Sequence, residues 1–244
     1  MPTPGGRGAD VKCLLHPGHV GQAEHLLPGD AALETEVKEN RAFSEMQAVA
    51  LGRLAGRSPL EIAEKAHILF DQEQQVFLFS SLGENITVRY PSYTIEPQLE
   101  EWHHLVILHY LEMADGTPLD QRIVSFGELR DGMVRGGGFD RTCEQTMARY
   151  FGKKPLENLQ AVCTALGGRL EDSNADLCAV LPFLPQYPVT WKLWLAEEED
   201  EIEGSGRLFL NGSADHYLSI EDAVTVGSII LDRLQRQYEM MFPG

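Results

Sequence analysis

The segment Asp215-His216-Tyr217-Leu218-Ser219-Ile220-Glu221-Asp222 runs from polar and aromatic residues directly into a strong helix start. Ser219 can accept a hydrogen bond from the backbone N–H near Asp222, and both acidic side chains lie where the helix dipole is positive. This 215–222 segment therefore predicts a fixed junction in the fold, from which a last helix over residues 220–238 begins.

The rest of the chain reads as helices and paired strands. Apolar residues recur at helical spacing over residues 37–54, 99–113, 139–150, 155–166 and 220–238, and Ser58-Pro59-Leu60-Glu61 predicts a short capped helix. Residues 75–80 and 86–90 alternate as a hairpin would, and residues 177–184, 189–195 and 207–211 read as strands. Because the strands come in pairs, we expect a helix-rich α+β fold with antiparallel strands packed on a central buried helix.

The central helix is expected over residues 99–113. Trp102, Val106, His109 and Tyr110 share one face, and apolar residues also occupy the opposite side. The triple glycine at residues 136–138 predicts a hinge or turn before the next helix. Cys143 and Cys163 fall on apolar helix stripes, which is typical of small core residues rather than nucleophiles.

The charge balance restricts the classes of partner. The 244 residues include 20 Lys and Arg against 37 Asp and Glu, a net charge of −17. Such a surface repels phosphate backbones and anionic lipids, so we expect neither nucleic acid nor a membrane surface as partner. No apolar run approaches the roughly 20 residues that span a bilayer. The four cysteines lack CxxC spacing and no signal-peptide core is present, which favours a cytoplasmic protein.

The first 34 residues are rich in Gly, Pro and His and show no sustained periodicity. They predict a flexible arm at residues 1–34, followed by a single α+β domain at residues 35–244. Within the arm, soft or borderline metal ligands gather at four positions, Cys13, His16, His19 and His25. Their spacing matches no zinc finger, so an arm without metal is the favoured reading and a metal site is the alternative.

Two histidines stand beside aromatic residues. His109 lies next to Tyr110 on the central helix, and His216 next to Tyr217 in the 215–222 segment. An imidazole in such a place can ligate the iron of a macrocycle or act as an acid or base, although a core histidine is the commoner case. Trp191 and Tyr217 belong to an aromatic cluster that can line a pocket for a flat ligand or simply fill the core.

Several blocks taken together resemble a family of uncharacterised domains found mostly in anaerobic bacteria and archaea. The matching blocks begin with Leu105–Leu111, Val124–Leu129 and Gly138–Asp140, and they continue with Leu166–Gly168, Leu181–Pro185 and Ser213–Asp222. In some members the domain follows an iron–sulfur motif like that of corrinoid iron–sulfur proteins. No four-cysteine motif precedes the domain in this sequence, so we expect no intrinsic iron–sulfur cluster.

The resemblance implies a setting in anaerobic redox or one-carbon metabolism. Our leading hypothesis is a binding or accessory protein that holds a flat cofactor, a corrinoid or haem, or docks a redox or corrinoid protein that carries one. The cofactor residues would be His109, Tyr110, Trp191, His216 and Tyr217. One alternative is an enzyme that uses His216 or His109 as acid or base with Asp215, Glu221 or Asp222 as its carboxylate. The other is a pure protein-interaction domain whose acidic face docks a basic partner.

Overall fold

The computed structural model describes residues 28–197 and 203–243, with side chains from residue 41 onward. Its strands form two antiparallel sheets. The first sheet has the strand order β1-β2-β3-β4 and the second has the order β5-β9-β8-β7-β6. The strands are β1 Leu69–Asp71, β2 Val76–Ser81, β3 Glu84–Arg89, β4 Thr94–Glu96, β5 Ile123–Val124, β6 Arg169–Leu170, β7 Leu177–Leu184, β8 Tyr187–Trp194 and β9 Ser205–Asn211.

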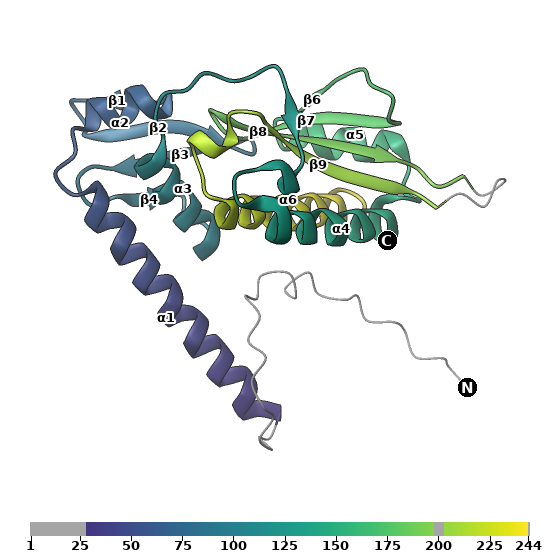
Figure 1. Cartoon of the computed structure of the whole chain (residues 1–244), viewed down its shortest axis with the longest axis horizontal. Helices are drawn as coiled ribbons and strands as arrows, with labels where there is room; N and C mark the ends of the chain where they lie inside the picture. The colour runs from purple at the N-terminus through teal and green to yellow at the C-terminus, as the bar shows by residue number, and fades with distance from the viewer. Residues whose placement is uncertain (1–27, 198–202, 244) are drawn as a thin grey trace.

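The helices surround these sheets (Figure 1). Their bounds are α1 Pro28–Leu54, α2 Pro59–Ala66, α3 Glu101–Met113, α4 Gly132–Phe151, α5 Leu156–Ala165 and α6 Ile220–Met241, with short 3-10 helices η2 Phe126–Glu128 and η3 Ala214–His216. In Figure 1, α4 and α6 run side by side below the second sheet, and α1 projects from the end of the molecule that holds the first sheet. The expected α+β class is confirmed.

The local signals in the sequence explain several of these elements. Ser58 accepts a hydrogen bond from the backbone N–H of Glu61 at the start of α2, and Ser219 does the same for Asp222 at the start of α6. Between β2 and β3 only Leu82 and Gly83 turn the chain, both with positive φ. A two-residue turn of this kind matches the twist of the strands it joins.

The two sheets meet at this turn. The backbone N–H of Leu82 donates to the carbonyl of Pro182 on β7 at 2.9 Å. A Cβ on Gly83 would lie 3.3 Å from the carbonyl oxygen of Ala165, so the turn approaches the end of α5 closely. Helix α3 fills the space beside this contact and buries residues of every face, among them Leu105, Val106, Ile107, Leu108 and Leu111. The central buried helix of the sequence prediction is thus confirmed.

The prediction of a hinge or turn at the triple glycine was wrong. Helix α4 already begins at Gly132, so residues 136–138 lie inside it. The physical reason is packing, because a Cβ on Gly136 would overlap the carbonyl oxygen of Phe126. Asp140 strengthens the same contact by accepting the backbone N–H of Gly127 at 2.9 Å. Glycine therefore lets η2 lie directly against α4.

Helix α1 begins at Pro28, so the predicted boundary between arm and domain at residues 34 and 35 falls inside this helix. The stretch before residue 37 contains good helix formers without an apolar stripe, and periodicity alone cannot detect such a start. Residues 1–27, the rest of the predicted arm, lie outside the described residues. No helix in the described part of the chain is both long and apolar enough to cross a membrane.

Candidate functional site

Five of the predicted site residues meet where α3 and the loop after it lie against the 215–222 segment. We call this the α3–α6 seam, and its contacts involve His109, Tyr110, Asp115, His216, Tyr217 and Asp222. His109 pairs with Asp222 at 2.6 Å, the rings of Tyr110 and Tyr217 stack at 5.5 Å, and His216 pairs with Asp115 at 2.7 Å. Trp191 is fully buried on β8, and its ring contacts Phe151 of α4 at 5.1 Å.

The two tyrosine rings occupy the centre of the seam. Both rings are fully buried, and their planes differ by 21°. Tyr110 donates its hydroxyl hydrogen to the carbonyl of Ala66 at 2.7 Å and accepts the backbone N–H of Gln186 at 3.1 Å. The hydroxyl of Tyr217 donates to the carbonyl of Thr117. The rings thus stack on each other in the place where a flat ligand was expected.

His109 and Asp222 form a largely buried ion pair, with side-chain exposures of 16% and 9%. Burial by itself lowers the pKa of His109, but the hydrogen bond and charge of Asp222 outweigh it and raise this pKa above its ordinary value. The second carboxylate oxygen of Asp222 accepts the hydroxyl of Ser219 at 2.7 Å. A carboxylate with partners on both oxygens orients the imidazole as well as capping the helix.

His216 and Asp115 form a second pair at the surface, with exposures of 43% and 50%. Burial would raise the pKa of Asp115, but hydrogen bonds from Thr117 and His216 dominate and lower it to about 2. An exposed imidazole held by a carboxylate is suited to proton transfer.

The carboxylates expected beside His216 have other contacts. Asp215 accepts the backbone N–H of Arg130 at 3.0 Å, and Glu221 lies 2.8 Å from the guanidinium of Arg135. The partner of His216 is Asp115, which the sequence reasoning missed. Asp115 also accepts the backbone N–H of Thr117 at 2.9 Å, and this Asx turn in Asp-Gly-Thr-Pro was the available signal for an ordered carboxylate. Asp115 and His216 are 101 positions apart, and no local sequence pattern predicts their contact.

A second contact missed from the sequence joins Ser81 on β2 to His103 on α3, at 2.9 Å. Burial, with a smaller effect of Arg233, lowers the pKa of His103 to about 4. The His103 ring also stacks on Phe183 at 5.0 Å. Because Ser81 is fully buried and His103 only 3% exposed, this neutral pair offers no surface to a substrate. It joins β2 to α3, and the stack on Phe183 connects α3 to the second sheet.

The described residues contain no group of three or more His, Cys, Asp and Glu side chains arranged to hold a metal ion. The predicted ligands Cys13, His16, His19 and His25 lie outside the residues that the structure describes. Cys143 and Cys163 are buried, as expected for core residues, and burial raises the pKa of each thiol to about 12. Such thiols are poor nucleophiles at neutral pH.

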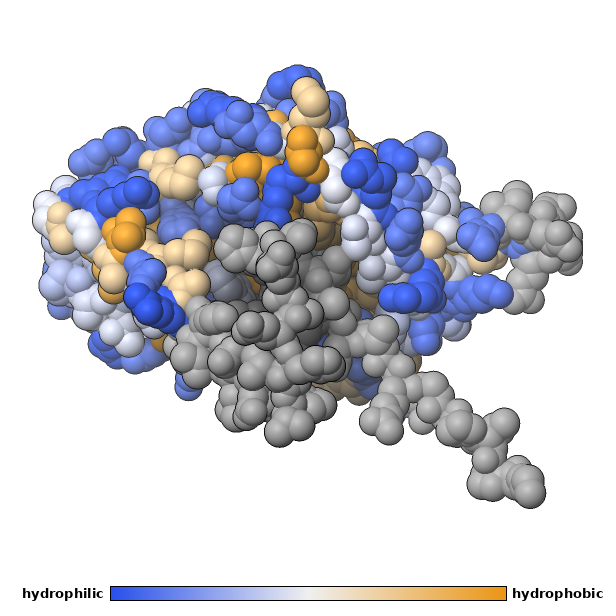
Figure 2. All heavy atoms as spheres, turned by 60° about the horizontal axis from the view of Figure 1, so that its bottom comes forward, coloured by the Kyte–Doolittle hydropathy of each residue, from blue (hydrophilic) through white to orange (hydrophobic). Residues whose placement is uncertain are grey.

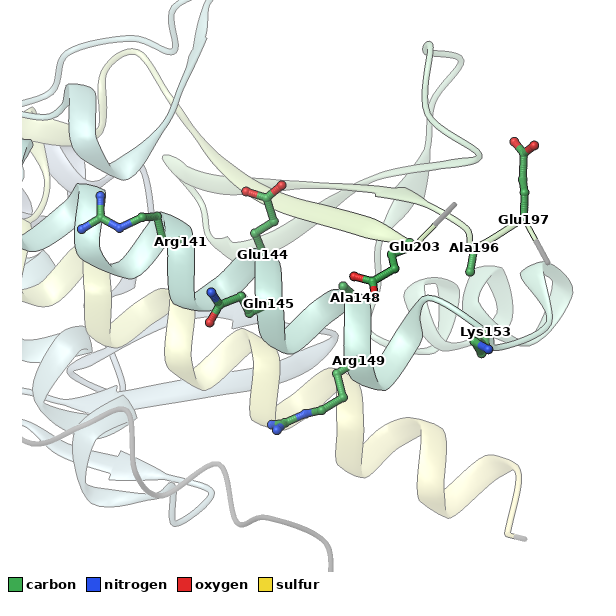
Figure 3. Close-up of a pocket in the computed structure, with 10 residues that line it drawn as sticks. Arg141, Glu144, Gln145, Ala148, Arg149, Lys153, Ala196, Glu197 and Glu203 are labelled. Atoms are coloured by element: carbon green, nitrogen blue, oxygen red, sulfur yellow. The ribbon is translucent and has the colours of Figure 1, made fainter. Parts of the chain in front are cut away.

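An open groove of about 960 Å³ lies between α4 and the ends of β8 and β9. We call it the α4 groove, and its lining includes Arg141, Gln145, Ala148, Arg149 and Lys153 from α4 and the turn after it, with Glu197 and Glu203 opposite. Figure 3 shows Glu144 pointing towards β9 and Arg149 pointing the opposite way. Glu144 accepts the hydroxyl of Ser205 at 3.1 Å.

The α4 side of this groove is basic, although the chain as a whole is acidic. Residues 132–154 hold five basic side chains and two acidic ones, whereas the whole chain has 20 and 37. Arg135 pairs with Glu221, and Lys154 lies 4.8 Å from the ring centre of Tyr238. Arg141 and Arg149 are exposed and make no ion pair or hydrogen bond with any residue that the structure describes. The groove as a whole is lined by Arg141, Arg149 and Lys153 and by Glu144, Glu197 and Glu203. Arg141 and Arg149 therefore attract anions on the α4 side of the groove.

Comparison with known proteins places the chain in a family. The family model described as "Domain of unknown function (DUF3786)" matches residues 58–233, most of the chain. The chain belongs to the DUF3786 family. No curated protein and no solved structure matches it.

The DUF3786 region begins at the residue that caps α2 and ends within α6. It contains every residue of the α3–α6 seam and every residue of the α4 groove named above. Helix α1 precedes the DUF3786 region. Both candidate sites therefore lie within the region that the family model matches.

Proposed function

We propose that this DUF3786 protein is a binding and accessory protein that docks an anionic segment of a partner protein in its α4 groove. The observation that carries the proposal is the pair of exposed arginines, Arg141 and Arg149, which lack partners among the described residues of a strongly acidic chain. Exposed charges further apart than the Debye length of about 8 Å are largely screened, so the distant acidic residues of the chain repel an anionic segment only weakly at the α4 face.

The docking form of the hypothesis has better support than the form in which the protein itself encloses a cofactor. A corrinoid or haem between α3 and the 215–222 segment would have to separate Tyr110 from Tyr217, whose rings are buried and stacked. The family resemblance favours a redox or corrinoid protein as the partner that carries the cofactor. If the partner carries the cofactor, this protein purified alone and without oxygen is colourless. A Soret-like or corrinoid absorption band in the isolated protein would favour a cofactor held by this protein instead.

The direct test measures binding of a fluorescently labelled glutamate-rich peptide by anisotropy at low ionic strength. We expect saturable binding that weakens as salt is added, because screening reduces the attraction between the peptide and the arginines. The double variant Arg141→Glu with Arg149→Glu should bind at least about tenfold more weakly, a change of about 1.4 kcal/mol.

A charge-matched control separates the groove from the net charge. Arg89 on β3 and Arg236 on α6 are exposed and lie outside the α4 groove. The double variant Arg89→Glu with Arg236→Glu changes the net charge by the same amount and should bind the peptide nearly as well as the wild type. Equal losses in the two double variants, or no saturable binding by the wild type, would rule out the α4 groove as the docking site.

A second candidate function is proton transfer by His216. Its support is the 2.7 Å contact between its Nδ1 and a carboxylate oxygen of Asp115, on a side chain that is 43% exposed. An activity with a bell-shaped pH profile that disappears in both His216→Ala and Asp115→Asn would favour this candidate. An activity retained in either variant would exclude it.

A further inference from the structure

The outer face of α4 continues beyond the α4 groove towards the start of the helix. Steps of three and four place Val134, Gly138, Arg141, Gln145 and Arg149 on one side of the helix, opposite the buried residues Phe139, Cys143 and Met147. Next to the groove, a second hollow of about 350 Å³ is lined by Val134, Gly138, Thr142 and Val224, among others. The outer face of α4 thus contributes Val134 and Gly138 to the second hollow and Arg141, Gln145 and Arg149 to the α4 groove.

Val134 at the start of this face and its neighbour Met133 are apolar and largely exposed. Met133 and Val134 are 86% and 83% exposed, the highest values for large hydrophobic side chains in the part of the chain that the structure describes. The face of the molecule in Figure 2 is mostly hydrophilic, and its hydrophobic residues form small separate patches. Contiguous exposed apolar surface rimmed by polar residues marks protein interaction sites.

Two glycines lie between the apolar and the basic ends. A Cβ built on Gly137 or on Gly138 would meet no atom within 4 Å, so neither glycine is required by the packing of this chain. In the middle of a helix each glycine costs roughly 1 kcal/mol relative to alanine. Small residues on a helix face allow the backbone of a second helix to approach closely. An uncompensated cost at two consecutive positions points to contact with something outside this chain.

From these three features we propose that the occupant of the α4 face is an amphipathic, acidic helix of a partner protein. An apolar residue of that helix contacts Met133 and Val134, its backbone passes over Gly137 and Gly138, and its carboxylates reach Arg141 and Arg149. At 1.5 Å per residue the face from residue 134 to residue 149 is about 22 Å long, which a partner helix of about 15 residues covers. The mode is that of a helix docked in a groove.

This inference rests on the proposed function, because it names the kind of partner that the same groove takes. A nucleic acid fits the features less well, because its phosphates would meet a chain of net charge −17 and would not use the apolar turn. A strand fits less well too, because the α4 face presents helix side chains rather than backbone N–H and C=O groups.

The test uses synthetic peptides of about 15 residues on one alanine and glutamine background. The first peptide carries a leucine anchor and two glutamates on one face. The second peptide has lysines in place of the glutamates, and the third lacks the leucine. The fourth peptide has a central proline that breaks the helix. We expect the first peptide to bind the full-length protein about tenfold or more tightly than each of the others.

The matched protein variants add bulk without adding charge or apolar surface. Gly137→Gln with Gly138→Gln should leave the fold intact, because both positions are open, and should weaken binding of the first peptide about tenfold or more. Gly52→Gln is the control, because Gly52 lies in α1 and is equally open. The control should bind as the wild type does, and circular dichroism should show unchanged helix content in both variants.

Two failures are distinguishable. If the proline peptide binds as well as the helical one and Gly137→Gln with Gly138→Gln has no effect, while Arg141→Glu abolishes binding, the helical occupant is wrong and the anionic docking site stands. If Arg141→Glu with Arg149→Glu has no effect on any peptide, the proposed function fails and the inference fails with it.

Discussion

His109 on α3 and Asp222 on α6 are 113 positions apart in the sequence, and their Nδ1 and Oδ1 atoms are 2.6 Å apart in the structure. The same carboxylate accepts the backbone N–H of Ser219 at 3.4 Å and so completes the capping box of α6. One side chain therefore starts the last helix and attaches it to the central one. The contact gives the α3–α6 seam a polar attachment beside its stacked tyrosines.

Replacing Asp222 by Asn should lower the free energy of unfolding by about 3 kcal/mol, because it leaves the largely buried His109 without its counter-charge and weakens the cap. Urea denaturation at neutral pH measures the change. Asp232→Asn is the control, because Asp232 lies on the same helix in an exposed pair with Arg236 and should cost no more than about 1 kcal/mol. Similar losses in both variants would contradict a special role for Asp222.

The His109 pair should also make stability depend on pH. Burial alone lowers the pKa of His109, but Asp222 raises it above the value in the unfolded chain. The pair's contribution is therefore fully present below the unfolded pKa of about 6.5 and is lost as pH rises through the folded pKa. The difference in unfolding free energy between wild type and His109→Gln should be larger at about pH 6 than at about pH 9. A difference independent of pH would refute the assignment.

His103 should act in the opposite direction. Burial lowers its pKa to about 4, so the folded protein holds the neutral imidazole and the unfolded chain takes up a proton first. The stability due to this group is lost as pH falls from about 6.5 towards about 4. In the His103→Gln variant the unfolding free energy should change less over this range than in the wild type. If the unfolding free energy of the variant changes as much at acid pH as that of the wild type, groups other than His103 cause the loss of stability.

Two buried tyrosines provide a matched pair of hydroxyl deletions. Tyr110→Phe removes the partner of Ala66 and of Gln186 and should cost about 1–3 kcal/mol. The hydroxyl of Tyr187 is buried and has no hydrogen-bond partner among the described residues, so Tyr187→Phe should be neutral or stabilising. Thermal unfolding of both variants measures the difference. A destabilisation by Tyr187→Phe as large as that by Tyr110→Phe would mean that the Tyr187 hydroxyl does have a hydrogen-bond partner.

The triple glycine provides a second matched pair. Gly136→Ala would drive a Cβ into the carbonyl of Phe126 and should cost about 3 kcal/mol or more by displacing η2. Gly137→Ala meets no atom within 4 Å and should stabilise α4 by roughly 1 kcal/mol. Chemical denaturation separates the two. A stabilising Gly136→Ala would mean that η2 does not lie against α4.

Short-range signals carried most of the correct structural predictions. The Ser58 and Ser219 caps predicted the starts of α2 and α6 because the interacting atoms are three residues apart. Apolar periodicity likewise predicted α3 and the long strands β7 and β8. It missed the start of α4, because the reason for glycine at 132 and 136 is the carbonyl of Phe126, which no local pattern contains.

The candidate site, too, divides into features set by neighbours along the chain and features set by long-range packing. The sequence by itself determined that His109, Tyr110, His216 and Tyr217 stand in two ordered segments, because helix caps and apolar stripes depend on neighbours along the chain. Only the tertiary structure decided that Asp115 is the partner of His216 and that the two tyrosine rings stack on each other. It also placed Arg141 and Arg149 beside an open groove, because side-chain pairing across about 100 residues depends on how the helices pack.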